Sequence, residues 1–255
     1  MSVESIMPLL EVRHLSKSFP NGMQALHDIN LAVRPGELLI LAGANGSGKT
    51  VLARHFNGLL QPSAGEVRFN GLPIARNLRA VRQQVGLVFQ DSDSQIVGET
   101  VAADIAFGPE NLGLSSSEVQ FRVTEALAMV ELTAVADWRP QQLSGGQKRK
   151  LVIAGILAMQ PQIVILDEPF TGLDYPGVVQ VIEQLLRLHQ TGHTLLVITH
   201  ELEKFLAHAT RLVVMAAGRI VADGTPEALL NDIEAYGIKK PYGADRPVAT
   251  MTWLK

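Results

Sequence analysis

The residues with the clearest capacity for chemistry form an eight-residue run. It reads Gly43, Ala44, Asn45, Gly46, Ser47, Gly48, Lys49 and Thr50, and fits the phosphate-loop pattern G-x-x-x-x-G-K-[ST] without departure. Glycines let a backbone curl around a polyphosphate, and a helix that starts after them aims unpaired N–H groups at it. We expect Lys49 to reach the β- and γ-phosphates of a nucleotide and the Thr50 hydroxyl to ligate Mg²⁺. The alternative is a glycine-rich turn that binds nothing.

Two neighbouring carboxylates supply the second chemical group. Asp167 and Glu168 follow the apolar run Ile163 to Leu166, which predicts a buried strand that ends at the acidic pair. A carboxylate at such a strand end suits Mg²⁺, so we assign Asp167 as a metal-orienting residue. Glu168 is oriented differently, and we assign it as the general base that polarises the attacking water. An acidic pair before Pro169 that simply ends a strand is the alternative.

A second predicted helix also starts at glycines and could bind an anion in the same way as the phosphate loop. Ser144, Gly145 and Gly146 precede a predicted helix and offer a capping hydroxyl, exposed N–H groups and a positive dipole end. Alone, these three residues indicate a flexible helix start. With Leu143 before them and Gln147 after them, the pentapeptide is far more specific.

Strands and helices must hold these groups in place. After the phosphate loop, Val51 to Phe56 continues as a helix. Several of the chemical residues follow apolar runs that predict buried strands: Leu38 to Ala42 before the phosphate loop, Val85 to Phe89 before Gln90, and Thr194 to Thr199 before His200. Further strands are predicted at Leu9 to Leu15, Leu26 to Val33, Glu66 to Phe69, Arg211 to Met215 and Arg219 to Ala222.

The middle of the chain differs in composition from its flanks. Between residues 91 and 160 we expect an inserted helical lobe, with a helix from Thr100 to Phe107, a loop from Pro109 to Ser117 and an amphipathic helix after it. The last residues, 232–255, form a tail whose function the sequence does not disclose, and a surface-packed or partly mobile end is expected.

Composition excludes several classes of protein. With 47% hydrophobic residues, 18% charged residues and a net charge of -3, the chain is globular and lacks the excess of Lys and Arg of a nucleic-acid binder. It contains no cysteine, so disulfides and thiolate metal sites are excluded. We expect no secretory signal at the N-terminus and no membrane helix, because the apolar stretches are too short.

The order of these motifs resembles the ATP-binding-cassette (ABC) family, whose signature is Leu-Ser-Gly-Gly-Gln. The resemblance implies an α/β fold with a P-loop NTPase core, an antiparallel β subdomain and the inserted helical subdomain. It places the ATPase domain at residues 9–231, between a flexible N-terminus at 1–8 and the C-terminal tail. It also implies ATP and Mg²⁺ as the cofactors.

The resemblance assigns roles to six further residues. Gln90 is similar to the Q-loop glutamine, which touches Mg²⁺ and the attacking water, and His200 to the switch histidine that contacts the γ-phosphate. Gly172, Leu173 and Asp174 resemble the D-loop. Phe19 lies in the turn region before the phosphate loop, where an aromatic residue either stacks on adenine or acts as a half-buried anchor. The family places its adenine-stacking aromatic there.

The family also implies a second ATPase subunit. In the family, the signature of one subunit closes over the phosphate loop of the other, so that Ser144, Gly145, Gly146 and Gln147 complete the partner's site. Since every motif is intact, two identical chains suffice, although a paralogous partner is equally allowed.

A narrower resemblance points to one transport group. The segment from Gln90 to Leu114 and the run from Ile153 to Met159 are similar to the ATPases of energy-coupling-factor (ECF) importers for vitamins, cobalt, nickel or biotin. It implies a transmembrane coupling protein and a substrate-binding membrane subunit as partners, and a peripheral location on the cytoplasmic face of the cell membrane. Lys150 and Glu201 depart from the family's usual arginine and aspartate, and neither touches a core catalytic role.

Two other functions are weighed against this one. The ATPase of a conventional permease with a soluble binding protein shares every catalytic motif, and only the segment from Gln90 to Leu114 argues against it. A soluble cassette protein acting on ribosomes or DNA usually carries tandem cassettes, long insertions or basic extensions, which this chain lacks.

Overall fold

The computed structural model describes residues 7–241 and 246–254 of the protein. Most of the predicted flexible segment 1–8 and a part of the tail therefore lie outside the described residues. The strands are β1 (Leu10–Ser18), β2 (Gln24–Val33), β3 (Leu38–Gly43), β4 (Ala64–Phe69), β5 (Leu72–Pro73), β6 (Val85–Val88), β7 (Ile163–Asp167), β8 (Thr194–Ile198), β9 (Arg211–Ala216) and β10 (Arg219–Gly224). The α-helices are α1 (Lys49–Phe56), α2 (Leu78–Gln84), α3 (Val101–Asn111), α4 (Ser116–Met129), α5 (Gly145–Leu157), α6 (Tyr175–Gln190) and α7 (Pro226–Leu229).

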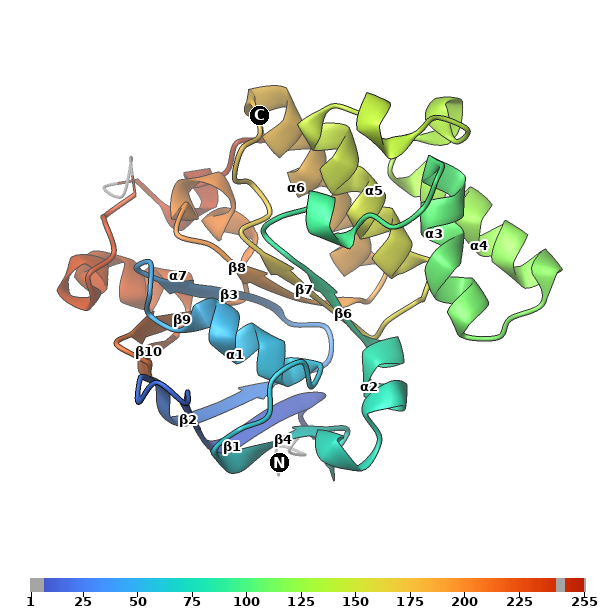
Figure 1. Ribbon diagram of the computed structural model, residues 1–255. Helices are drawn as coiled ribbons and strands as arrows, with labels where there is room; N and C mark the ends of the chain where they lie inside the picture. Colours follow the sequence, from blue (N-terminus) through green and yellow to red (C-terminus); the bar gives the residue numbers. More distant parts are fainter. Residues whose placement is uncertain (1–6, 242–245, 255) are drawn as a thin grey trace, which may run out of the picture.

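A six-stranded sheet forms the centre of the molecule, in the order β10-β9-β3-β8-β7-β6 (Figure 1). The strands from β9 to β6 are parallel to their neighbours, and β10 is an antiparallel edge strand. Strands buried on both faces read as continuous apolar runs, which is why β3, β6, β7 and β8 could be predicted from the sequence. Because parallel strands end at one edge of a sheet, the residues that follow them meet there.

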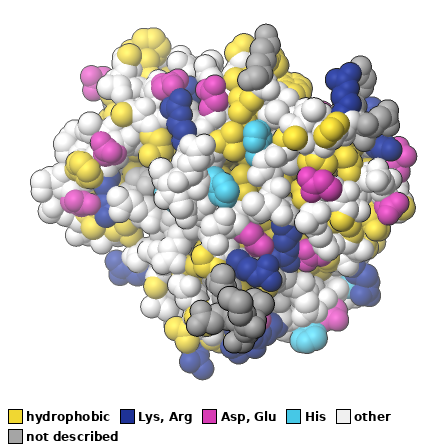
Figure 2. All heavy atoms as spheres, turned by 180° about the vertical axis from the view of Figure 1, so that it is seen from behind, with side chains coloured by type: hydrophobic (Ala, Val, Ile, Leu, Met, Phe, Trp, Pro, Cys, Tyr) yellow, Lys and Arg dark blue, Asp and Glu magenta, His cyan; other side chains and the backbone are white. Residues whose placement is uncertain are grey.

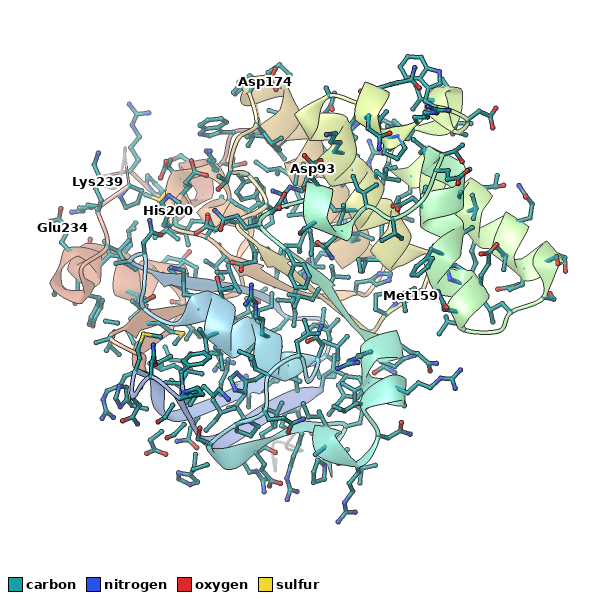
Figure 3. The ribbon with its side chains drawn as sticks, viewed as in Figure 1. Asp93, Met159, Asp174, His200, Glu234 and Lys239 are labelled. Carbon is teal, nitrogen blue, oxygen red and sulfur yellow. The ribbon has the colours of Figure 1, made fainter. Side chains whose placement is uncertain are left out.

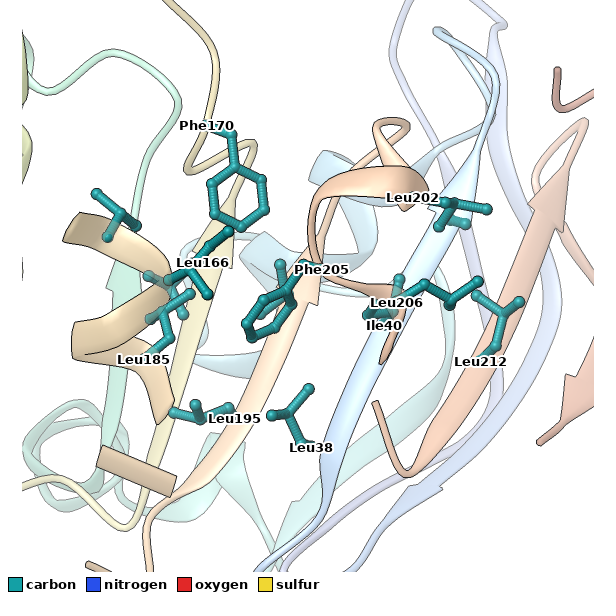
Figure 4. Packing of buried hydrophobic residues seen from close by; sticks show 14 of the residues in the cluster. Leu38, Ile40, Leu166, Phe170, Leu185, Leu195, Leu202, Phe205, Leu206 and Leu212 are labelled. Carbon is teal, nitrogen blue, oxygen red and sulfur yellow. The ribbon is translucent and has the colours of Figure 1, made fainter. Parts of the chain in front are cut away.

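The second sheet is antiparallel, with four strands in the order β2-β1-β4-β5. Helix α1 lies between the two sheets, and its Leu52 and Phe56 join one apolar core with Leu39 and Leu41 of β3. Alternate residues of the same strand face the other side of the sheet. There Leu38, Ile40 and Ala42 pack in a second core with β7, β8 and α6 (Figure 4). The predicted fold class is confirmed.

Helices α3, α4 and α5 pack around an apolar cluster of their own, beside the edge strand β6 (Figure 1). They fall within the segment 91–160. The prediction of a loop from Pro109 to Ser117 is wrong in its first part, because α3 continues through Pro109 to Asn111. Proline removes one helical hydrogen bond, but here its ring is buried and the Asn111 side chain donates to the carbonyl of Phe107 at 2.7 Å.

The C-terminal segment is built into the body of the protein. Ile233, Ile238, Val248 and Met251 are buried in the core that also contains β8 and α6. Acidic and basic side chains are interspersed over the face shown in Figure 2, which suits the small net charge of -3. Within the described ranges, every helix is too short or too polar to span a membrane.

Candidate active site

One large cavity, of about 860 Å³, opens at the carboxyl ends of β3, β7 and β8. The predicted site residues that line it are Asn45, Gly46, Gly48, Lys49, Thr50, Gln90, Asp167, Glu168 and His200. The other lining residues are Met23, Gln24, Ala25, His27, Val51, Thr171, Ala217 and Gly218. The phosphate loop, both carboxylates, Gln90 and His200 therefore share one site, although they are distant in sequence.

The phosphate loop needs its glycines for two different reasons. Gly46 and Gly48 adopt the left-handed conformation, with φ of 80° and 102°, which side chains other than glycine rarely tolerate. At Gly48 a Cβ would also lie 2.9 Å from the carbonyl oxygen of Ala25. The loop is thereby folded tightly against β2, and α1 starts with its N-terminus at the cavity.

Lys49 crosses the loop from the first turn of α1. Its ammonium group donates to the carbonyls of Gly43 at 2.6 Å and Ala44 at 3.0 Å. Burial lowers the pKa of Lys49, and the carboxylates Glu168 and Asp167 oppose that effect. A buried cation held between backbone carbonyls and two carboxylates is well placed to bind phosphate oxygens.

Asp167 ends β7 and is buried beside the loop. Burial raises the pKa of its carboxyl, while the hydrogen bond from Thr50 and the charge of Lys49 oppose the rise. Among the described residues, the Asp167 Oδ1 atom has no hydrogen-bond partner. A hydroxyl and an unpaired carboxylate oxygen side by side are the oxygen ligands that Mg²⁺ prefers, and the remaining ligands of such ions usually come from phosphates and water. The residues present thus fit Mg²⁺.

The raised pKa of Asp167 leads to a prediction about stability. Replacing Asp167 by Asn should stabilise the nucleotide-free chain by roughly 0.5–2 kcal/mol at pH 8, because a buried charge is removed. Below its raised pKa the wild-type carboxyl is already neutral, so the gain should shrink as the pH falls. Urea unfolding of both proteins from pH 5 to 8 measures this difference. A gain that grew toward low pH would contradict the assignment.

Glu168 adopts an unusual backbone conformation. Its φ of 50° is in the left-handed region, which costs a non-glycine residue on the order of 1–3 kcal/mol. The backbone N–H of Glu168 donates to the carbonyl of Ile198 at 2.9 Å, so the neighbouring strand maintains this turn. The turn brings the carboxylate Oε1 within 2.8 Å of the His200 Nδ1 atom, which donates to it. In the described structure the other oxygen, Oε2, is buried without a hydrogen-bond partner, and Glu168 is one of the residues that line the cavity.

The loop that carries Gln90 is anchored by a residue that sequence reasoning missed. Arg149, on α5, donates to the carbonyls of Phe89 at 2.6 Å and Gln90 at 2.7 Å. The Gln95 side chain closes the loop, since it accepts from the N–H of Phe89 and donates to the carbonyl of Leu87. Burial lowers the pKa of Arg149, but an arginine remains charged. In the sequence, only the position of Arg149 two residues after Gln147 could have indicated this contact.

The signature residues are not part of this cavity. Ser144 and Gln147 cap the start of α5 reciprocally, since each side chain accepts from the other's backbone N–H. This leaves the N–H groups of Gly145 and Gly146 at an exposed helix start. Asp174 likewise lies outside the cavity, and its side chain caps α6 by accepting from Gly177 at 3.0 Å (Figure 3).

Phe19 is also absent from the cavity lining. Its ring lies beside the Lys17 ammonium group, 5.5 Å from the ring centroid. Met23, from the same turn, lines the cavity instead. The stacking of Phe19 on a nucleobase therefore stays a prediction.

The part of the cavity near Met23 is lined by residues to which the sequence assigns no function. The hairpin residues Ala217 and Gly218 lie against β2, where the His27 N–H donates to the Gly218 carbonyl at 2.8 Å. Gly218 in turn donates to the carbonyl of Ser47, which braces the phosphate loop. No sequence pattern marks His27 or Thr171 as lining residues, because their approach depends on the packing of distant strands.

Comparison with known proteins gives a consistent result. The family model described as "ABC transporter" matches residues 26–171. The energy-coupling factor transporter ATP-binding protein EcfA of Methanocaldococcus jannaschii is 44% identical over 231 residues, covering 89% of this chain and 83% of that protein. The cobalt import ATP-binding protein CbiO of Rhodobacter capsulatus is 43% identical over 244 residues, covering 93% and 87%. The structure of CbiO1 from Clostridium perfringens, part of the ABC transporter complex CbiONQ, aligns with a TM-score of 0.82 and 34% identity, covering 90% of this chain and 93% of that one.

Proposed function

The chain belongs to the ABC transporter family of ATPases, and on this basis we propose that it is the ATP-hydrolysing subunit of an ECF-type importer. The observation that carries the ATPase part is the gathering of Lys49, Asp167, Glu168 and His200 around one cavity. The ECF part is supported by the similarity to EcfA and CbiO, whose names refer to energy coupling and cobalt import. We propose a vitamin or a transition-metal ion as the transported solute.

The residues that line the cavity have different roles in ATP hydrolysis. The phosphate loop and Lys49 bind the β- and γ-phosphates through N–H groups and the ammonium group. Thr50, Asp167 and Gln90 would hold Mg²⁺, which neutralises phosphate charge when bound. Glu168 accepts a proton from the attacking water, while His200 holds the carboxylate through Oε1 and contacts the γ-phosphate.

We propose that two subunits act together. The cavity is open, so a γ-phosphate bound in it is exposed to water on one side. The exposed N–H groups of Gly145 and Gly146 offer an anion-binding helix start outside the chain's own cavity. A second copy, or a paralogue, would cover each cavity with this helix start and exclude bulk water.

The membrane partner is proposed to bind near the loop that carries Gln90. Val97 and Phe107 are 61% and 54% exposed, although both are apolar, and they line a small groove between this loop and α3. Asp104 holds the groove in shape, because its carboxylate accepts from the N–H groups of Val97 at 2.7 Å and Gly98 at 2.8 Å. A coupling helix of a transmembrane protein that packs in this groove would contact the loop that carries Gln90, so its position would depend on that loop. The same contact would hold the chain at the cytoplasmic face of the membrane.

The test is a pull-down of the tagged chain from detergent-solubilised membranes of its native host, followed by mass spectrometry. Recovery of a transmembrane coupling protein with a small, very hydrophobic subunit would support the ECF function and identify the solute. Recovery of a conventional permease would favour the second candidate, which shares the catalytic motifs. Purely soluble partners would contradict a membrane role.

Phe107→Asp should abolish the recovery of the transmembrane protein in this pull-down, because docking of an apolar helix would bury the new carboxylate. The ATPase rate of the isolated chain should stay within about twofold of the wild-type rate. Phe121→Asp is the matched control, since Phe121 is 57% exposed on α4 and outside the groove. If Phe107→Asp still captured the membrane protein, the groove would not be the docking site.

A further inference from the structure

The C-terminal residues connect two loops of the ATPase site. We use the name C-terminal strap for Val248 to Leu254, of which Val248 and Met251 are buried in the core. Figure 1 shows the C-terminal end next to the start of α6, directly after the D-loop residue Asp174. The strap also contacts the loop after His200. Figure 3 labels His200 and Asp174, near which the two contacts of the strap lie.

Trp253 contacts the D-loop side through Tyr175, the first residue of α6. The two aromatic rings are 5.5 Å apart, and the Tyr175 hydroxyl donates to the Trp253 carbonyl at 3.2 Å. Tyr175 is 50% exposed, so the strap rather than the core determines where its ring lies. The strap is therefore in direct contact with the residue that follows Asp174.

Trp253 also contacts the loop after His200, residues 201–208, which we call the switch loop, and it does so through Lys204. The Lys204 ammonium group lies 4.7 Å from the ring centroid of Trp253, and the backbone N–H of Trp253 donates to the backbone carbonyl of Lys204 at 3.2 Å. Lys204 is buried and forms an ion pair with Glu201, the residue next to His200. A cation between an indole face and a carboxylate has little freedom to move.

The rest of the strap holds the same loop. The N–H of Ala207 donates to the carbonyl of Met251 at 3.0 Å, and the His208 ring is 2.8 Å from the Thr252 hydroxyl. Residues 202–208 contain two 3₁₀ turns, and the side chains of Leu202, Phe205 and Leu206 are buried in the core. The side chain of His200 is 47% exposed, so the core restrains it less than it restrains the loop that follows, and the strap adds polar contacts to that loop.

We propose that Trp253 is a positioning residue for ATP hydrolysis. It ties the switch loop to the D-loop, and so keeps the His200 imidazole on the Glu168 carboxylate while the site closes. The role rests on the proposed ATPase function, and it acts through His200 without contact between Trp253 and the nucleotide. A conformational signal at the D-loop would reach His200 by the same route.

The test is a double-mutant cycle on the full chain. Trp253→Ala should lower kcat roughly tenfold, because small displacements of a catalytic group have effects of this order or larger. The KM for ATP should change less than about threefold, since the phosphate loop is untouched. In a His200→Ala background, the same substitution should change kcat less than about twofold, because the group that it positions is already gone. Trp253→Phe should restore most of the rate.

Two controls separate this role from a general loss of folding. Trp138→Ala removes the other tryptophan of the sequence, which is 46% exposed in the helical lobe, and should leave kcat unchanged. If Trp253→Ala fails to fold by circular dichroism, Tyr175→Ala replaces it, because Tyr175 is half exposed and carries the D-loop contact.

The outcomes distinguish this inference from the proposed function. Wild-type kcat in Trp253→Ala, or a full additional loss in the His200→Ala background, would overturn the positioning role and leave the ATPase function intact. A wild-type chain that hydrolyses no ATP would overturn both.

Discussion

Replacing Glu168 by Gln is expected to reduce kcat for ATP hydrolysis by roughly 10²–10⁴-fold, the usual effect of losing a general base. The amide keeps the size of the side chain and can still accept from His200 Nδ1, which lies 2.8 Å from Glu168 Oε1. It cannot take a proton from water. Binding of ATP should persist, because Lys49 and the phosphate loop are unchanged, and the variant should accumulate as an ATP-bound dimer.

Phosphate release and size-exclusion chromatography with ATP measure both halves of this expectation. Glu234→Gln is the matched control, since Glu234 (labelled in Figure 3) is exposed and does not line the cavity. Turnover at the wild-type rate in Glu168→Gln would show that the base is another residue. Loss of ATP binding would show instead that the carboxylate has a structural role in the site.

Replacing Lys49 by Met is expected to weaken ATP binding by roughly 10–100-fold, because a charge-assisted hydrogen bond is worth about 1.5–3 kcal/mol. The substitution keeps the length of the apolar stem and removes the ammonium group that bridges the Gly43 and Ala44 carbonyls. It also leaves Asp167 and Glu168 without the cation that opposes their mutual repulsion. Hydrolysis should fall at least as far as binding.

Isothermal titration with ATP and Mg²⁺ measures the affinity. Lys239→Met is the control, because Lys239 is exposed and outside the cavity (Figure 3). An unchanged dissociation constant for Lys49→Met would contradict the placement of the γ-phosphate beside this side chain. A matching loss in the control would indicate a non-specific effect of charge.

Several features of the site were open to prediction because their signals are local. The turn at Gly46 and Gly48 needs the left-handed conformation, so its glycines appear in the sequence at fixed spacing. The strands before Gln90, Asp167 and His200 are buried on both faces, so each reads as an unbroken apolar run. The place of Glu168 after Asp167 predicts its role as the base, but its left-handed backbone has no sequence signature.

Other features depend on contacts between residues far apart in the chain. Arg149 lies 59 residues from Gln90 in the sequence, and only the packing of α5 against β6 brings its guanidinium to that loop. The ring of Phe19 lies beside Lys17 and does not line the cavity, whereas Met23 does. The conformation of the turn that contains both residues determines which of them lines the cavity. Pro109 is buried within α3, and the helix is packed against α4 and α5 through Val101 and Ile105.

The sequence by itself determined the phosphate loop, the acidic strand end and the alternation of strand and helix, because backbone conformation and burial leave patterns within a few residues. Tertiary structure alone decided which strand ends meet in the cavity, which residue anchors Gln90, and that Trp253 ties the switch loop to the D-loop. These are contacts across the order of the sheet, and the free energy that selects them comes from packing of the whole core rather than from any one segment.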